Sequence, residues 1–340
     1  MAKHNLIAID LAKNVFQVCG MTQHNQVIFN RQLKRSDLKE FMVNHPPVEV
    51  AMEACYSSHY WARCFEAMGH TVRLIPAQHV KPFVRGNKSD RNDAVAIGEA
   101  ARRPNIKPVP TKSVEQQDIQ CLHRIRERHI SHRTGLMNQA RGLLAEYGII
   151  APTGHKAFRI LLREVTQPEY ALISSLIKTQ IIQVIDEYNL HSQCIEESLE
   201  LLTRIAKENP LCLFLLSIPG IGVINATAII SAIGDGSQFK CAREFAVWLG
   251  LTPKQASSGQ TFTSSGITKR GNRYLRKQLV HGARSALSRC RSKTDSVSTW
   301  ANQLVARRGF NKASVAMAAR MARTCWVLLN KKEVYQVATS

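Results

Sequence analysis

The sequence predicts an α/β domain followed by helices, an α/β plus α fold class, on the basis of three observations. Short apolar runs alternate with helix-like segments over roughly the first hundred residues. Apolar residues then recur every seven residues along two long segments. From Leu211 onward the pattern is mainly helical. Because 340 residues exceed one typical compact core, we expect domains at residues 1–110, 111–209 and 210–340.

The N-terminal domain is expected to contain a mixed sheet. Strands are predicted at residues 5–10, 15–21, 26–33, 48–53 and 71–75, the first three as a meander. Helices are predicted to begin at Ser36, Ser58 and Lys88, and the last of them reaches Ala101. Three prolines at positions 104, 108 and 110 then indicate a linker.

Two long amphipathic helices are expected in the central segment, at residues 114–148 and 170–208. In the first, the seven-residue register is held by Leu122, Leu136 and Leu143, with Ile130, Met137 and Leu144 beside them. In the second, it is held by Ile181, Tyr188, Ile195 and Leu202. This periodicity predicts that the two helices pair as an antiparallel coiled coil.

The first long helix also carries many arginines and histidines. Arginines on a helix, such as Arg124 and Arg128, can follow a phosphate backbone, although a solvated surface explains them equally well. His123, His129 and His132 have no cysteine or carboxylate at ligand spacing. No chemistry is therefore expected of these histidines.

The balance of charge predicts a polyanionic partner. Lys and Arg number 46 against 25 Asp and Glu, which gives a net charge of +21. Such a charge attracts nucleic acid above all, although acidic membranes and ribosomes also attract basic proteins. Between Gly266 and Ser340, 16 residues are Lys or Arg, and the only acids are Asp295 and Glu333. The C-terminal domain is therefore expected to contact nucleic acid.

The cysteines and the apolar segments indicate a compartment. The nine cysteines form no C-x-x-C pair, and an odd number fits neither a disulfide framework nor a zinc ribbon. No export signal and no apolar segment of membrane-spanning length is visible. These features favour a reducing cytoplasm and no membrane partner.

Four acids form the first candidate site. Asp10 and Glu53 end two predicted strands, and Asp90 and Asp93 share one face at the start of a predicted helix. If that helix crosses the edge of the sheet, the four carboxylates converge, and hard divalent cations such as magnesium prefer such oxygen-rich sites. The alternative is that the acids are helix caps or surface charges. That alternative suffices for Asp93 alone, but burial of Asp10 and Glu53 is costly without a cation.

Residues 218–222, Ile-Pro-Gly-Ile-Gly, are typical of the hairpin in a helix-hairpin-helix element. Gly220 and Gly222 would let backbone amides approach a phosphate, and the N-terminus of the next helix would favour the anion. An ordinary tight turn between two helices is the alternative.

The second candidate site combines serines with cations. Ser257 and Ser258 precede Gly259 in a segment that we predict to be a flexible loop. The cations that follow are Lys269, Arg270, Arg273 and Arg276. A serine in this setting could attack a phosphodiester and hold a covalent link, although serines in loops are commonly turn residues.

Taken together, these motifs resemble the Asp-Glu-Asp-Asp insertion-sequence transposases, a family to which the pilin-gene inversion recombinase is related. The N-terminal motifs are residues 9–18 (IDLAKNVFQV), 52–55 (MEAC) and 89–94 (SDRNDA). The C-terminal motifs are residues 219–222 (PGIG), 248–253 (WLGLTP), 257–259 (SSG) and 267–272 (ITKRGN). The ordered set extends over nearly the whole chain.

The resemblance implies a RuvC-like, RNase H-type N-terminal domain whose acids Asp10, Glu53, Asp90 and Asp93 bind magnesium. It implies a central coiled coil for assembly and a C-terminal domain whose serine forms a phosphoserine link to DNA. It further implies a tetramer built as two dimers, in which the serine of one subunit works beside the carboxylates of another. A structured noncoding guide RNA from the element would pair with target and donor DNA. Such a protein is expected in the bacterial cytoplasm, at the nucleoid when it acts.

One departure from the family pattern concerns the serine. The family often has a single serine before two glycines, whereas Ser257 and Ser258 are adjacent here and Gln260 follows Gly259. Alignment on the glycine selects Ser258, with Ser257 as a competitor.

Nucleic-acid contacts are expected from Lys13, Arg124, Arg128, Gly220, Gly222, Lys269, Arg270, Arg273 and Arg276. Two alternatives to the transposase remain. A RuvC-like nuclease that uses water predicts that Ser258→Ala spares cleavage. A nonenzymatic nucleic-acid scaffold predicts no dependence on magnesium and no effect of Asp10→Ala.

Overall fold

The computed structural model describes residues 5–87, 89–258 and 261–336. The chain divides into two compact units, Met1–Ser113 (unit 1) and Val114–Ser340 (unit 2), and each has its own hydrophobic core. The boundary between them lies close to the one expected at residue 110. The further division expected between residues 209 and 210 falls inside unit 2, where it stays a prediction.

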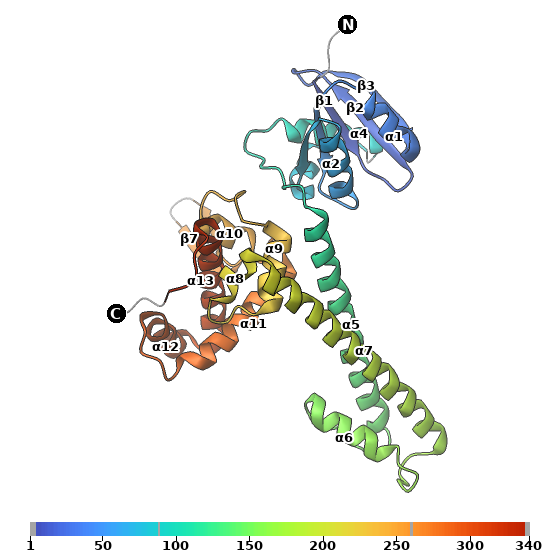
Figure 1. The fold of residues 1–340 in the computed structure, drawn as a ribbon, viewed down its shortest axis with the longest axis vertical. Coiled ribbons are helices and arrows are strands. Elements are labelled where there is room, and N and C mark those ends of the chain that lie inside the picture. The colour runs from blue at the N-terminus through green and yellow to red at the C-terminus, as the bar shows by residue number, and fades with distance from the viewer. Residues whose placement is uncertain (1–4, 88, 259–260, 337–340) are drawn as a thin grey trace. The chain divides into compact units, whose positions relative to one another are not determined.

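Unit 1 contains a five-stranded mixed sheet with the strand order β3-β2-β1-β4-β5 (Figure 1). β1 (Leu6–Asp10), β2 (Val15–Met21) and β3 (Val27–Lys34) form an antiparallel meander. β4 (Glu49–Glu53) runs parallel to β1, and β5 (Thr71–Ile75) runs parallel to β4. The predicted strands are confirmed, and the arrangement is consistent with an RNase H-like fold.

Helices cover both faces of this sheet. Successive residues of a strand face opposite sides, so Leu6 and Ala8 share a core with α4 (Asp90–Ala101). Ile7 and Ile9 pack on the other side with α1 (Arg35–Val43) and α2 (Ser58–Ala67). The strand is therefore apolar without interruption until it reaches Asp10. The short α3 (Ala77–Val80) and a 3-10 turn (Lys81–Phe83) connect β5 to α4.

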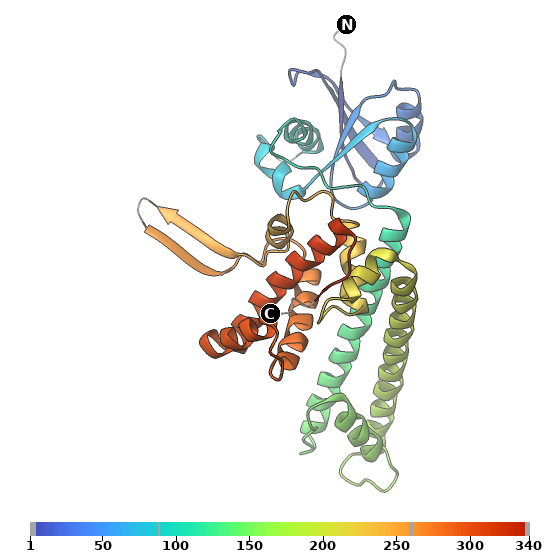
Figure 2. The same cartoon turned by 60° about the vertical axis from the view of Figure 1, so that its left-hand side comes forward.

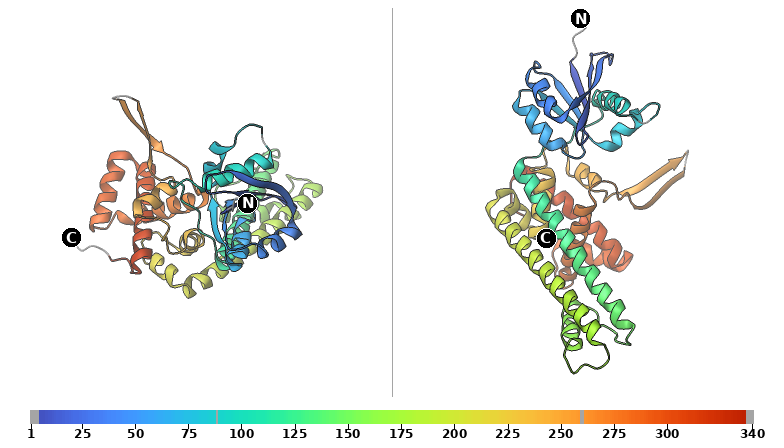
Figure 3. Two further views of the ribbon diagram at one scale, coloured as in Figure 1. Left: turned by 90° about the horizontal axis from the view of Figure 1, so that it is seen from above. Right: turned by 90° about the vertical axis from the view of Figure 1, so that its right-hand side faces the viewer.

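Two long helices dominate one end of unit 2. α5 (Val114–Ala145) and α7 (Ser175–Glu208) lie side by side (Figures 2 and 3). They are antiparallel, because Leu144 near the end of α5 shares a core with Ile181 near the start of α7, and Ile119 shares another with Leu202. The predicted helices are confirmed, and supercoiling of the pair stays a prediction.

The seven-residue register holds for α7 but is wrong by one position in α5. The predicted seam residues of α7 are all buried, whereas Leu143 is 38% exposed and its neighbour Leu144 is fully buried. The core of α5 therefore follows Met137 and Leu144. The sequence pattern also missed α6 (His155–Val165), which packs on this pair through Phe158, Leu162 and Val165.

The rest of unit 2 is mainly helical, as predicted. Its helices are α8 (Pro210–Leu216), α9 (Val223–Ile233), α10 (Ala242–Trp248), α11 (Arg273–Cys290), α12 (Ser296–Arg308) and α13 (Phe310–Lys331). They enclose one core together with the Ile119 end of α5. Many of the buried positions are alanines, as at Ala226 and Ala322, and small side chains allow the helices to approach closely.

A two-stranded hairpin interrupts the helices. β6 (Pro253–Ser258) and β7 (Thr261–Ile267) pair antiparallel and project from the helical body of unit 2 (Figure 2). Its base is tightly packed: a Cβ atom on Gly250 would lie 2.1 Å from the carbonyl oxygen of Arg270. A Cβ atom on Gly271 would lie 1.8 Å from the carbonyl oxygen of Trp248. The two chain segments at the base therefore cross in direct backbone contact. Only glycine, which has no side chain, fits at positions 250 and 271 of this crossing.

Gly271→Ala is expected to destabilise unit 2 by at least about 2 kcal/mol. The residue has φ +79°, which disfavours a side chain, and the added methyl group would collide with the backbone of Trp248. Urea denaturation measures the loss. The control is Gly266→Ala in β7, where an added Cβ meets nothing within 4 Å. Equal stability of the two variants would show that the crossing is not required.

A buried histidine joins three helices of unit 2. His123 of α5 lies 3.0 Å from the Thr227 hydroxyl through Nε2 and 2.9 Å from the Tyr274 hydroxyl through Nδ1. Thr227 donates its own proton to the carbonyl of Val223, so it accepts from Nε2–H and leaves Nδ1 to accept from Tyr274. Burial, aided by Arg126, lowers the pKa of His123 to about 4. The histidine is therefore neutral and structural.

The free energy of unfolding of unit 2 is expected to fall as pH drops below 6.5. Between pH 6.5 and about 4, His123 is protonated in the unfolded chain and neutral in the folded chain. The loss should reach about 2 kcal/mol at pH 5. Urea denaturation at pH 7 and pH 5 measures it. His123→Gln should remove this part of the slope, whereas the exposed His24→Gln should leave it unchanged.

Candidate active site and nucleic-acid contacts

Two acids lie at the ends of neighbouring strands in unit 1. β1 and β4 are parallel, with Ile9 opposite Met52, so Asp10 and Glu53, the next residue in each strand, reach the same edge of the sheet. Both are half-buried. The parallel pairing, which the sequence pattern does not specify, is what brings them together.

The first turn of α4 brings Asp90 and Asp93 toward the same edge. Ser89 is the N-cap of this helix, because its hydroxyl accepts from the amide of Asn92. Asp90 is therefore the first residue of the helix and not its cap. The helix lies close to the sheet at Gly98, where a Cβ atom would come within 2.3 Å of the sulfur of Met21 and 3.3 Å of the Cβ of Ala8. The absence of a side chain at position 98 therefore lets α4 pack closely against β1 and β2.

Three of the four predicted acids form a compact cluster. Asp10, Asp90 and Asp93 each offer a carboxylate oxygen, and these oxygens all lie within 4.8 Å of one another. Burial raises the pKa of Asp10 to about 6, and repulsion from Asp93, Asp90 and Glu53 adds to it. Glu53 lies outside this closest group, but burial and Asp93 raise its pKa as well. Asp10 therefore interacts electrostatically with the three other acids, and Glu53 interacts with Asp93. Their joint role as a metal site stays a prediction.

The donor set suits a divalent cation. Carboxylate oxygens are the ligands that hard cations prefer. Burial is the largest cause of the raised pKa of Asp10, and repulsion from the other three acids adds to it. A bound cation would remove that repulsion. The residues present thus fit a divalent metal ion.

A turn beside the cluster was not singled out from the sequence. After Glu53, Ser58 donates from its hydroxyl to the carbonyl of Cys55, and Ser57 has a left-handed backbone with φ 62°. The turn leaves Tyr56 79% exposed. The turn lies next to the acids because Cys55 is the second residue after Glu53. Burial, Glu53 and Asp10 raise the pKa of the Cys55 thiol to about 11. Residues 55–58 show neither helix nor strand periodicity, so the sequence gave no signal for this turn.

Ser257 and Ser258 are the last two residues of β6, so the prediction of a flexible loop is wrong at these positions. In the hairpin Ser257 pairs with Phe262 and Ser258 pairs with Thr261. The polar sequence resembles a loop, and the strand forms because β7 supplies a partner. Gly259 lies outside the described residues.

The Ile218–Gly222 segment connects α8 to α9, and the helix-hairpin-helix assignment stays a prediction. Gly220 has φ +89°, and its Cβ would lie 2.6 Å from the carbonyl oxygen of Gly282 in α11. Gly222 precedes α9 and has open space around its Cβ position. Packing against α11 therefore accounts for Gly220, and Gly222 is the more accessible of the two.

Most of the predicted cationic contacts are at the surface. The exposed ones are Lys13, Arg124, Arg128, Lys269, Arg270 and Arg273. Arg276 is half-buried and donates to the carbonyls of Leu249 and Arg270, at 2.9 and 3.0 Å. It therefore stabilises the base of the hairpin. Contact of any of these residues with nucleic acid stays a prediction.

Both units are similar to known transposases. The DEDD transposase model of IS110, described as "Transposase", matches residues 7–149, and the model described as "Transposase IS116/IS110/IS902 family" matches residues 212–298. The chain is 44% identical, over 97% of its length and 98% of the relative's, to a "Probable family 20 transposase" of Pseudomonas aeruginosa. It is 40% identical, over 97% of its length and 91% of the relative's, to the "Transposase for insertion sequence element IS1111A" of Coxiella burnetii.

The chain belongs to the DEDD transposases of the IS110/IS116 family. It is an insertion-sequence transposase, an enzyme whose substrate is DNA, and its acidic cluster is suited to a divalent metal ion. The first matched range includes all four acids, and the second includes both serines. The transposase is also distantly similar to the "Pilin gene-inverting protein" of Moraxella bovis, at 24% identity over 80% of each chain.

No helix among the described residues of the transposase has the length and apolar character needed to cross a membrane.

Proposed function

We propose that this transposase cuts and rejoins DNA through a phosphoserine intermediate, with magnesium held by Asp10, Glu53, Asp90 and Asp93 and with Ser258 as the nucleophile. The observation that carries the proposal is the convergence of the Asp10, Asp90 and Asp93 carboxylates within 4.8 Å. Acids held together against mutual repulsion serve chemistry rather than stability. The resemblance of the C-terminal motifs supports the role of the serine.

Formation and reversal of the phosphoserine need no reactant besides Ser258 and the DNA. The Ser258 oxygen attacks the phosphorus atom, loses its proton, and the bond from phosphorus to one deoxyribose oxygen breaks, with that oxygen taking up a proton. In the reverse step a free DNA hydroxyl attacks the phosphoserine and releases Ser258. Because the covalent link conserves the energy of the phosphodiester, rejoining needs no nucleotide cofactor.

The role of the four acids is to bind the metal ion and to fix its position. Asp10 at the end of β1 and Glu53 at the end of β4 hold their positions through the sheet, and the capped first turn of α4 holds Asp90 and Asp93. Magnesium bound there would supply Lewis-acid polarisation of the scissile phosphate and neutralise developing negative charge.

The proposed partners are a guide RNA and further copies of the chain. The resemblance supports a structured noncoding RNA that pairs with target and donor DNA, and a tetramer built as two dimers. The net charge of +21 supports a protein that covers much polyanion surface. We place this activity in the bacterial cytoplasm, at the nucleoid.

Trapping of the covalent intermediate tests the proposal. The transposase is incubated with junction DNA, the RNA transcribed from the noncoding end of its element, and magnesium, and SDS-resistant protein–DNA adducts are measured. We expect adducts that disappear with EDTA and fall strongly without the RNA. Metal-dependent cutting with no adduct under any condition would replace the serine with water as the nucleophile. Cutting that is equal without RNA would remove the guide.

Mixing two inactive variants tests whether the site is shared between subunits. Asp10→Asn and Ser258→Ala are each expected to form no adduct alone. If the serine of one subunit works beside the acids of another, an equimolar mixture should recover about a quarter of the wild-type adduct. Half of the acid sets and half of the serines are then intact, and subunits that assemble at random complete about a quarter of the sites. Adduct should appear only on the Asp10→Asn chain, identified by a size tag. No recovery after verified subunit exchange would place both groups in one subunit.

A further inference from the structure

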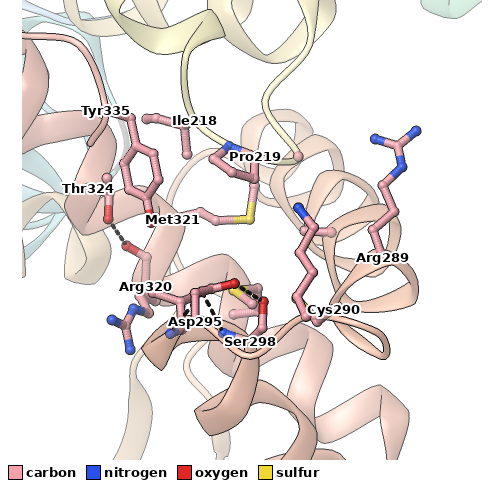
Figure 4. Close-up of a pocket in the computed structure, with 15 residues that line it drawn as sticks. Ile218, Pro219, Arg289, Cys290, Asp295, Ser298, Arg320, Met321, Thr324 and Tyr335 are labelled. Atoms are coloured by element: carbon pink, nitrogen blue, oxygen red, sulfur yellow. Dashed lines mark hydrogen bonds between the residues drawn. The ribbon is translucent and has the colours of Figure 1, made fainter. Parts of the chain in front are cut away.

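A cavity of about 190 Å³ lies in unit 2, and neither the four acids nor the two serines line it. The Ile218–Gly220 turn, the C-terminal end of α11, the start of α12 and the middle of α13 form its walls. Tyr335, from the segment after α13, closes one side, and the side chain of Met321 forms part of its interior (Figure 4).

The cavity has an apolar interior. Ile218, Cys290, Met317 and Met321 line it and are each at most 7% exposed. Cavities of about 150 Å³ lined by such side chains accommodate a benzene molecule. A volume of about 190 Å³ therefore has room for a six-membered aromatic ring with small substituents, and it favours a pyrimidine over the larger purine.

The rim of the cavity is cationic. Arg289 and Lys293 are exposed, and Arg320 is half-buried with its guanidinium 5.0 Å from the centre of the Trp300 ring. The one acid in the lining, Asp295, caps α12 by accepting from the amides of Val297 and Ser298 and from the Ser298 hydroxyl (Figure 4). The cations thus outnumber the acid at the rim, which suits a phosphate.

The wall beside the turn is rigid. A Cβ atom on Gly282 of α11 would lie 2.2 Å from the carbonyl oxygen of Gly220, so the helix and the turn are in direct backbone contact. The nearby Asn225 donates to the same carbonyl. A rigid wall means that the cavity exists before any ligand arrives, which lowers the cost of binding.

We propose that this cavity receives one unstacked pyrimidine of a nucleic-acid strand, with its ring on the apolar floor and its phosphate at Lys293 and Arg289. An apolar pocket with a cationic rim is complementary to a nucleotide, whose base is apolar on its faces and whose phosphate is anionic. The proposal rests on nucleic acid being the ligand of this family and is independent of the serine chemistry. It gives the transposase a way to hold a distorted strand through residues other than the four acids and Ser258.

Saturation-transfer NMR with the full-length protein and dCMP tests the proposal. The H5 and H6 protons of the ring should receive saturation from the wild type, and dAMP should compete at least about tenfold less well. Deoxyribose 5-phosphate, which lacks a base, should not displace dCMP. Stronger binding of dCMP than of CMP would assign the cavity to DNA, and the reverse would assign it to RNA.

Variants locate the binding. Thr324→Phe fills the cavity from α13 and should abolish the transfer, and Val297→Phe fills it from α12 if the first variant fails to fold. Lys293→Gln should weaken binding, whereas Arg291→Gln, an exposed cation in the same turn that does not line the cavity, should not. Transfer that is unchanged in a folded cavity-filling variant would overturn the proposal. The adduct assay is unaffected by that outcome, so the two proposals fail separately.

Discussion

Asp10→Asn is expected to lower the rate of DNA strand cleavage by at least about a thousandfold. Asp10 is the acid on which the other three converge, and burial together with those acids raises its pKa to about 6. The substitution removes one charged ligand and leaves the shape of the side chain nearly unchanged. Single-turnover cleavage of junction DNA at saturating magnesium measures the effect.

The same substitution should leave the metal-free protein at least as stable. A raised pKa means that ionised Asp10 costs folding free energy at neutral pH, and asparagine carries no charge to repel Asp90 and Asp93. Urea denaturation in EDTA measures this. Asp37→Asn, an exposed acid in the first turn of α1, is the control. It should leave cleavage unchanged and should lower stability by no more than about 1 kcal/mol, because it removes a charge that favours the helix N-terminus. Cleavage within tenfold of wild type would exclude Asp10 from the active site.

Ser258→Ala is expected to abolish the covalent adduct, whereas Ser257→Ala is expected to retain it. The adduct is a bond to the serine oxygen, and alanine has no atom to replace it, so the loss should be complete rather than partial. Ser257 is the matched control because it is adjacent on the same strand. Densitometry of SDS-resistant adducts, with equal folding checked by thermal denaturation, measures both. Loss in Ser257→Ala alone would transfer the role to that residue.

Much of unit 1 could be predicted because its strands are marked by local runs of apolar residues in the sequence. A strand such as β1 is an uninterrupted apolar run that ends at Asp10, and β4 repeats this pattern up to Glu53. The sequence does not specify how closely the acids approach, because that depends on packing between distant segments. The close packing of Gly98 in α4 on Met21 in β2 is one such contact. The four acids were therefore predicted, and the tighter group of three was not.

The errors in unit 2 have the same physical origin. The β6–β7 hairpin is polar and rich in serine, so its sequence resembles a loop, and its base depends on contacts of Gly250 and Gly271 with other segments. In α5 both Leu143 and Leu144 fit a heptad pattern, and only packing against α7 and α6 selects Leu144. Local pattern identifies an element, and tertiary contacts decide its register and its partner.

Mass spectrometry of the trapped adduct shows directly whether Ser258 is the residue linked to DNA. Adduct trapped with wild-type transposase, junction DNA, element RNA and magnesium is digested with trypsin and nuclease and sequenced by tandem mass spectrometry. Cleavage after Lys254 and Lys269 places both candidate serines in the peptide of residues 255–269. We expect a nucleotide phosphate on Ser258. A nucleotide on a residue outside that peptide, or cut DNA with no modified peptide, would contradict it.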